Sequence, residues 1–301
     1  MSVNSSRQSN AFQRVAGLLS QSFLFSRGRR IYEQNSKCWN LPLSKVDKLW
    51  AGSFLILQDY SIGKFPPTFE DQQAAYKAER DFNESLPGLD LSDVQEGHAR
   101  KPFWGSVRFA KYSADFVRLL RVFEQIGVTK GQRLLEVGCG PGWTAEFLAL
   151  SAFSVVGTTI AAHDVLLARQ RADAFRLRGL AETLEFKESP MESVDSLFDR
   201  PEQFDAAYVY EALHHAFDWR KAVQSVGRCL KPGGWLVLAN EPNVLHTCIS
   251  YRISRLSNTH EIGFRQKDLL SGLRGSGFKT FRIFSPKLNN LVTQHWIAAR
   301  K

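Results

Sequence analysis

Short apolar runs alternate with helix-length segments after residue 131, and this alternation constrains the fold more than any other feature of the sequence. Strands separated by helical crossovers form a parallel sheet with helices on both faces. The last two runs are close enough in sequence to pair as an antiparallel hairpin. The sequence therefore predicts an α/β fold with a doubly wound, mostly parallel, seven-stranded sheet. The expected strands are residues 134–137, 155–159, 184–186, 206–210, 235–239, 281–284 and 295–299.

The part of the chain before this pattern predicts a mainly helical N-terminal extension. Residues 36–103 are rich in aromatic side chains and in turn signals, without sustained strand alternation, so we expect short helices and loops there. Apolar positions at helical spacing run from residue 104 to residue 126, and Gly127 ends them as a C-terminal glycine. We therefore expect a basic extension over 1–35, an aromatic-rich helical cap or appendage over 36–103, and the main domain over 104–301.

The first 32 residues contain five arginines, seven serines and no acidic residue. Phe12, Val15, Leu19 and Phe23 recur at helical spacing within them. This composition is typical of a transit peptide, and it also fits a basic helix on a membrane surface or a frayed terminal extension. Composition alone favours the extension, and both peripheral membrane contact and organelle targeting stay open as alternatives.

The cysteine and histidine content indicates neither a disulfide framework nor a metal site. The four cysteines and seven histidines show no C-x-x-C pair and no metal-ligand spacing, so we expect no metal and a reducing, cytoplasmic location. No apolar run approaches the roughly 20 residues that a membrane-spanning helix needs, so we expect no transmembrane segment.

The net charge of +9 is distributed unevenly. Residues 1–130 hold 18 Lys and Arg against 13 Asp and Glu, residues 131–242 hold 11 against 15, and residues 243–301 hold 10 against 2. The basic flanks could attract nucleic acid, anionic lipid or a phosphorylated substrate, or they could simply be a solvated surface. We favour the solvated surface, because no arginine-rich run lies inside a recognisable nucleic-acid-binding motif.

The stretch LLEVGCGPGW, residues 134–143, places a glycine-rich loop after the first expected strand. Such loops usually hold phosphate, but Glu136 would repel an anion in a partly desolvated site and would attract an ammonium group. Gly138, Gly140 and Gly142 follow a G-x-G-x-G spacing, and the third glycine of a dinucleotide-binding loop would fall at Trp143. We therefore expect a cationic ligand without phosphate at the carboxyl edge of the sheet.

The E-V-G-C-G-P-G stretch resembles the first motif of the class I S-adenosylmethionine-dependent methyltransferases, and FDAAYVYEALHH and LKPGGWLVLANEP resemble that family's fourth strand and entry to the fifth strand. The resemblance covers about residues 131–301, and it implies a Rossmann-like domain with S-adenosylmethionine as cofactor. It implies that Glu136 faces the methionyl ammonium and that the glycines let the backbone approach the cofactor. The cofactor-binding set that it implies is Glu136, Gly138, Cys139, Gly140, Gly142, Thr159, Ile160, Met191 and Tyr210.

Two positions depart from the family pattern. Thr159 stands where the second strand usually ends in an acidic residue that accepts both ribose hydroxyls. A hydroxyl accepts fewer and weaker hydrogen bonds than a bidentate carboxylate. Three explanations stay open: another acid such as Asp164 reaches the ribose, the affinity for the cofactor is modest, or the chain is a catalytically inactive relative. After the third strand, Pro190 replaces the acidic residue often found near the adenine amino group, although Ile160 and Met191 still offer apolar faces.

Methyl transfer from a sulfonium depends mainly on alignment, and a hydroxyl acceptor also needs a base. His214 and His215 follow the fourth strand, with Glu211 one turn earlier, so one of the three could serve as that base. A structural role for the histidine pair is the competing interpretation. The expected substrate contacts are Trp143, Glu241 and His260.

These features favour a methyltransferase acting on a small-molecule acceptor, with O-methylation preferred and the aromatic region as a cap. An RNA methyltransferase that uses the basic flanks is the second hypothesis, although the chain has no recognisable RNA-binding module. A cofactor-binding relative without catalysis is the third, and the intact loop around Glu136 disfavours it.

Overall fold

A computed structural model describes residues 3–34, 43–66, 71–84, 91–103, 105–180, 183–285 and 293–301. The chain forms two compact units, a helical unit of residues 1–89 with 244–263 and a sheet unit of residues 90–243 with 264–301. The stretch 91–103, expected in the cap, thus belongs with the sheet, and 244–263 belongs with the N-terminal helices. Trp39 of the expected cap and Trp104, the first residue of the expected main domain, lie outside the described residues.

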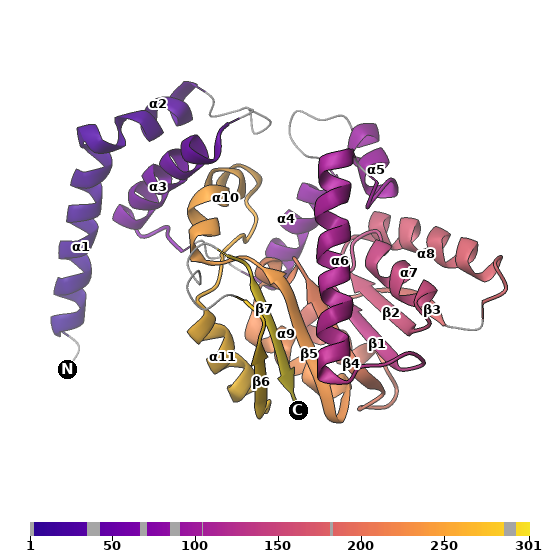
Figure 1. The fold of residues 1–301 in the computed structure, drawn as a ribbon. Coiled ribbons are helices and arrows are strands. Elements are labelled where there is room, and N and C mark those ends of the chain that lie inside the picture. The colour runs from indigo at the N-terminus through magenta and orange to yellow at the C-terminus, as the bar shows by residue number, and fades with distance from the viewer. Residues whose placement is uncertain are drawn as a thin grey trace. The chain divides into compact units, whose positions relative to one another are not determined.

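The sheet unit is built on seven strands in the order β3-β2-β1-β4-β5-β7-β6 (Figure 1). Strands β1 to β5 are parallel, and β7 pairs antiparallel with both β5 and β6. The predicted seven-stranded, mostly parallel sheet with a closing hairpin is therefore confirmed. The strands are β1 Arg133–Val137, β2 Ser154–Thr159, β3 Leu184–Glu188, β4 Phe204–Tyr210, β5 Leu230–Glu241, β6 Thr280–Ile283 and β7 His295–Arg300.

Helices cover both faces of this sheet, as side-chain alternation along buried strands requires. On one face pack α6 (Ser106–Ile126), α7 (Trp143–Leu150) and α8 (Ala162–Arg176). On the other pack α9 (Trp219–Cys229), α11 (Gln266–Gly275) and the 3-10 segment η2 (Met191–Leu197). The unit also contains α5 (Leu91–Ala99) and the 3-10 turn η3 (Leu213–His215).

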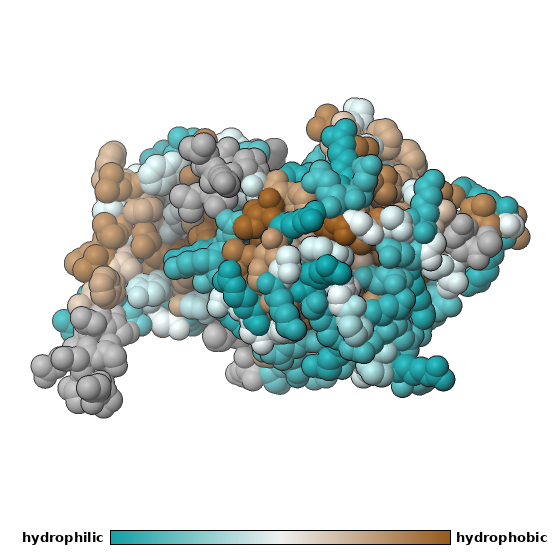
Figure 2. Space-filling model, turned by 60° about the horizontal axis from the view of Figure 1, so that its bottom comes forward, coloured by the Kyte–Doolittle hydropathy of each residue, from teal (hydrophilic) through white to brown (hydrophobic). Residues whose placement is uncertain are grey.

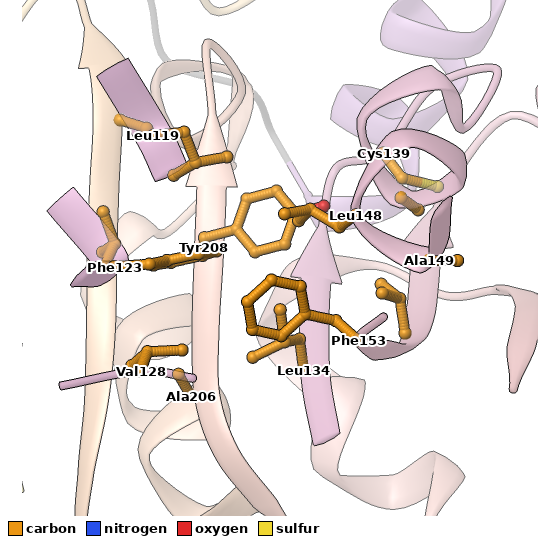
Figure 3. Packing of buried hydrophobic residues seen from close by; sticks show 14 of the residues in the cluster. Leu119, Phe123, Val128, Leu134, Cys139, Leu148, Ala149, Phe153, Ala206 and Tyr208 are labelled. Carbon is orange, nitrogen blue, oxygen red and sulfur yellow. The ribbon is translucent and has the colours of Figure 1, made fainter. Parts of the chain in front are cut away.

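Aromatic rings fill the core between β1, β4 and the first helix face (Figure 3). The Phe123 ring centroid lies 5.8 Å from that of Tyr208 and 6.0 Å from that of Phe153, and all three side chains are buried. Leu134 and Leu148 close the same cluster with no measurable exposure. This packing fixes β1 and β4, the two strands whose carboxyl ends carry the glycine loop and Glu211.

Local sequence signals mark helix ends, as predicted for Gly127. Gly127 caps α6 with a left-handed φ of +78°, and Asp218 accepts backbone hydrogen bonds from Arg220 and Lys221 at the start of α9. Helix α8 ends at Arg176, and residues 231–234 form a bulge inside β5, where they face Asp205 alone.

The helical unit consists of α1 (Val3–Gln21), the 3-10 turn η1 (Phe23–Phe25), α2 (Ser26–Gln34), α3 (Lys45–Ser61), α4 (Gln72–Glu84) and α10 (Val244–Ser257). Helices α1, α2 and α10 all pack on α3. A Cβ on Gly52 would lie 1.7 Å from the Cys248 carbonyl oxygen, so α3 and α10 touch backbone to backbone. The buried Asp59 carboxylate joins them, accepting a 3.0 Å hydrogen bond from the Tyr251 hydroxyl and an ion pair from Arg255.

Candidate functional site

The glycine loop lies between β1 and α7, with all three glycines at positive φ. A Cβ on Gly138 would come within 2.5 Å of Ala212 Cβ, and one on Gly142 within 2.6 Å of the Phe186 ring, so the protein's own packing requires both glycines. Gly140 differs, because a Cβ there would meet only Asp164 Oδ2, at 3.8 Å. The loop therefore leaves open room beside Gly140 alone.

Glu136 lies on β1 with 2% of its surface exposed. Its Oε1 accepts a hydrogen bond from the Thr144 hydroxyl of α7, while Oε2 is buried and finds no hydrogen-bond partner within the described ranges. Burial raises the pKa of Glu136 to about 7, against the lowering effects of the Thr144 hydroxyl, the Tyr208 hydroxyl and the Ala145 backbone N–H. A buried carboxylate oxygen without a donor is what a ligand ammonium would satisfy.

Asp164, at the first turn of α8, adjoins the open side of the loop. Its side chain is buried, and Oδ1 lies 2.8 Å from Nδ1 of His98 on α5. Thr159 ends β2 and is 7% exposed against 3% for Asp164, so burial does not distinguish the two as ligand contacts. Of these two residues, Asp164 carries the carboxylate.

The residues expected near an adenine ring divide into two groups. Ile160 and Met191 are half-buried and follow β2 and β3, so each can present an apolar face at the carboxyl edge. The Cys139 side chain is packed in the core beneath the loop, where burial raises the pKa of its thiol. Only the backbone of Cys139 therefore faces a ligand.

A hydrogen-bonded cluster joins the carboxyl ends of β4 and β5 to α6. Asn240 donates from Nδ2 to Glu211 Oε1 at 2.7 Å and to Asp115 Oδ2 at 3.1 Å. The Tyr210 hydroxyl donates to Asp115 Oδ2 at 2.8 Å, and Lys111 Nζ donates to Glu211 Oε1 at 2.7 Å. Burial raises the pKa of Asp115, partly offset by the hydrogen bond from Tyr210. We call these five side chains the strand-end cluster.

Lys101 connects this cluster electrostatically to the loop side. Burial lowers the pKa of its ammonium group, and the carboxylates of Asp164 and Glu211 both act to raise it. Trp143 adds an apolar wall, with its ring centroid 5.9 Å from that of Tyr210 and 5.5 Å from that of Tyr112. The candidate site thus has two buried carboxylates, Glu136 and Asp164, near the loop, one polar cluster at the strand ends, and aromatic rings at Trp143.

Glu241, expected to touch substrate, is fully buried at the end of β5. Its Oε1 accepts the backbone N–H groups of Ala212 and Leu213 at 2.9 Å, and its Oε2 lies 3.1 Å from His214 Nδ1. Burial raises the pKa of Glu241 to about 7, and these backbone hydrogen bonds lower it. The geometry gives Glu241 the task of holding the turn η3 and orienting a histidine.

The two histidines of η3 differ in access. His214 is buried, whereas His215 is half-buried, and their ring centroids are 4.1 Å apart. His260 belongs to the helical unit, where its backbone N–H donates to Glu79 Oε1 at 2.9 Å. The structure therefore groups His214, His215 and Glu211 around the ends of β4 and β5.

Sequence reasoning missed His98, Lys101, Lys111, Asp115 and Asn240. Four of the five lie in the stretch 91–126, before the recognisable motifs, and only the tertiary fold brings them to the strand ends. The position of Asn240 could have identified it as a candidate site residue, since it immediately precedes the last residue of β5. Among the described residues, no three His, Cys, Asp or Glu side chains come together in a way that could hold a metal ion.

Known proteins resemble this chain in sequence. Residues 135–238 match the family model described as "Methyltransferase domain". A ubiquinone biosynthesis O-methyltransferase of Leptothrix cholodnii is 26% identical over 192 residues, covering 61% of this chain and 79% of the relative. An S-adenosyl-L-methionine-dependent Diels-Alderase, iccD, of Talaromyces variabilis is 34% identical over 177 residues, covering 56% of this chain and 57% of the relative.

The fold also matches solved structures. Magnesium protoporphyrin IX methyltransferase from Synechocystis PCC 6803, with bound SAH, aligns with a TM-score of 0.56 and 16% sequence identity. The alignment covers 75% of this chain and 99% of that protein. At this identity the likeness establishes the fold, which is that of a Rossmann-like methyltransferase.

Proposed function

We propose that this chain, which carries a class I S-adenosylmethionine-dependent methyltransferase domain, transfers a methyl group to a hydroxyl of a small molecule. We further propose that it does so in the cytoplasm, in keeping with the free thiols of Cys139, Cys229 and Cys248. The observation that carries the proposal is the buried Glu136 oxygen without a donor, beside a loop that is open only at Gly140.

The residues around the loop fit the cofactor. Glu136 would neutralise the methionyl ammonium, Asp164 would accept hydrogen bonds from the ribose, and Ile160 and Met191 would flank the adenine. When bound, S-adenosylmethionine supplies a methyl group activated by its positive sulfur. The chain contributes a fixed position for the acceptor beside that methyl group, which is the main requirement of an in-line displacement.

The acceptor proton goes to His214 in this proposal. Glu241 fixes Nδ1 of the ring, so Nε2 is the nitrogen that would take the proton as the new carbon–oxygen bond forms. His215, more exposed, would border the acceptor. The strand-end cluster would bind the polar groups of the acceptor, because it presents two carboxylates, an amide and a phenol at one edge of the sheet.

Two other functions make different predictions. An RNA methyltransferase would incorporate label into RNA and would lose acceptor binding steeply as salt rises. The relative from Talaromyces is named as an S-adenosyl-L-methionine-dependent Diels-Alderase. An enzyme of that kind, which binds S-adenosylmethionine without transferring its methyl group, would release no methylated product.

The test separates cofactor binding from transfer. Calorimetry of the full chain with S-adenosylmethionine, and with Glu136→Gln as the control, measures binding. Incubation with methyl-labelled cofactor and a panel of phenols, catechols and aliphatic alcohols then measures transfer. Binding with labelled O-methyl product supports the proposal. Binding with label only in added RNA, or with no labelled product across the panel, overturns it.

A further inference from the structure

Helix α1 exposes its large apolar side chains instead of burying them. Phe12 is 64% exposed, Val15 52% and Leu18 71%, and Leu19 is also exposed. At 100° per residue these four positions fall within one continuous side of the helix. Phe23 and Leu24 of η1 extend the patch, at 90% and 65% exposed. We call these six residues the α1 patch, and Figure 2 shows apolar side chains gathered over this part of the chain.

The opposite side of α1 makes the helix–helix contact. Ala16 and Ser20 are buried against the neighbouring helices, and a Cβ on Gly17 would lie 3.5 Å from Ser61 Cβ of α3. Small residues thus pack inward and large apolar residues point outward. This inverts the usual pattern of a solvent-facing helix, and an exposed apolar patch of this kind marks a binding surface.

Within residues 1–32, which contain the α1 patch, all side-chain charges are positive, because this segment contains no Asp or Glu. Arg14 on α1 and Arg30 on α2 are exposed, and Arg27 is 60% exposed although it pairs with Asp47 at 2.6 Å. Apolar side chains flanked by arginines complement an anionic bilayer, in which negatively charged headgroups cover the apolar acyl chains.

We infer that the α1 patch is a peripheral membrane-binding surface for anionic phospholipids, with Phe12, Leu18 and Phe23 entering the acyl boundary and the arginines contacting phosphate. This inference is independent of the proposed methyl transfer, because it concerns the helical unit alone. Within the described ranges no helix is long and apolar enough to cross a bilayer.

The experiment is co-sedimentation of the full chain with vesicles of phosphatidylcholine alone or of phosphatidylcholine mixed with phosphatidylglycerol. We expect binding to the mixed vesicles that is at least about tenfold tighter than to the neutral ones. The double variant Leu18→Ser/Phe23→Ser should weaken binding at least about tenfold. Arg14→Gln/Arg30→Gln should weaken binding to the mixed vesicles only.

Matched controls keep the outcome decisive. Leu177→Ser removes a leucine of the sheet unit that is 90% exposed, against 71% for Leu18, and should leave vesicle binding unchanged. Because all the substituted side chains are exposed, circular dichroism should show the same fold in every variant. Wild type that fails to sediment with the mixed vesicles overturns the inference, as does a Leu18→Ser/Phe23→Ser variant that binds like wild type. Light scattering that shows a dimer lost in that variant, without vesicle binding, assigns the patch to a second copy instead.

Discussion

Asn240 and Glu211 are joined by a 2.7 Å hydrogen bond, and both have left-handed backbones, with φ of +59° and +48°. Each stands at the carboxyl end of a central strand of the sheet, β5 for Asn240 and β4 for Glu211. Non-glycine residues in this conformation cost on the order of 1 kcal/mol or more and persist where the surroundings hold them. Two such residues bonded to each other at one sheet edge indicate a site shaped for a ligand.

Replacing Asn240 separates the backbone contribution from the side-chain contribution. Asn240→Gly relieves the strain but removes the hydrogen bonds to Glu211 and Asp115, so we expect a melting temperature near that of wild type and an acceptor KM raised about tenfold or more. Asn240→Ala should lose the same contacts and in addition about 1 kcal/mol of stability. An unchanged KM in the glycine variant would show that the strand-end cluster does not bind the acceptor.

The glycine loop offers a matched pair of substitutions. A Cβ added by Gly140→Ala would make only an ordinary contact, with Asp164 Oδ2 at 3.8 Å, so we expect the substitution to cost about 1 kcal/mol for its positive φ while weakening S-adenosylmethionine binding at least tenfold. Gly138→Ala collides with Ala212 and Met191, so it should cost about 2–3 kcal/mol even without cofactor. Thermal unfolding and calorimetry check both. A Gly140→Ala protein that binds cofactor normally would place the ligand elsewhere.

Stability of the cofactor-free protein should depend on the protonation of Glu136. The folded state raises its pKa from 4.5 to about 7, so the stability that protonation provides is complete below 4.5 and is lost as pH rises to about 7. The side chain in Glu136→Gln is neutral at every pH, so this variant does not lose stability as pH rises to about 7. We expect the variant to gain on the order of 2–3 kcal/mol over wild type between pH 4.5 and 8.

Denaturant unfolding at the two pH values measures this difference. Glu241 also has a raised pKa and contributes a similar slope to both proteins, so the difference between them isolates Glu136. Cofactor affinity should change in the opposite direction, tightening as pH rises through 7 because an ionised carboxylate binds the ammonium. A pH-independent gap between the two proteins would mean that Glu136 does not titrate in this range.

The ribose contact can be assigned by comparing two positions. If Asp164 accepts the ribose hydroxyls, Asp164→Asn should weaken cofactor binding about tenfold, since an amide oxygen can still accept from His98 but carries no charge. Thr159→Val should then have little effect, and Thr159→Asp should weaken binding. If Thr159 is the contact, Thr159→Asp tightens binding instead. Calorimetry with folded variants distinguishes the two cases.

The sequence predicted the sheet because its signals are local. Each strand is a short apolar run, and Gly127 and Asp218 mark helix ends through their own backbone and side-chain chemistry. The glycine loop was also predictable, since Glu136 and its glycines are adjacent in the chain. Local signals could not show why a side chain is excluded at each glycine, because the residues that pack against Gly138 and Gly142 come from elements distant in the sequence.

The strand-end cluster could not be predicted for the same reason. Lys111 and Asp115 repeat at helical spacing on α6 and look like an ordinary solvated face until the fold brings them to Glu211 and Asn240. Glu241 was identified as a site residue by its place at a strand end, but a substrate contact and a buried anchor are indistinguishable there from sequence. Only its hydrogen bonds to Ala212 and Leu213 separate them.

The contact between Gly52 and Cys248 sets an order for folding during synthesis. Helix α3 leaves the ribosome early, but α10, its backbone-to-backbone partner, follows only after β1 to β5 have been made. The N-terminal helices must therefore wait with an unfinished core while the central strands emerge, a reversal of the usual N-terminal-first sequence. A nascent chain stalled before residue 244 would expose the surface of α3 that α10 covers, and would be a natural client for a chaperone.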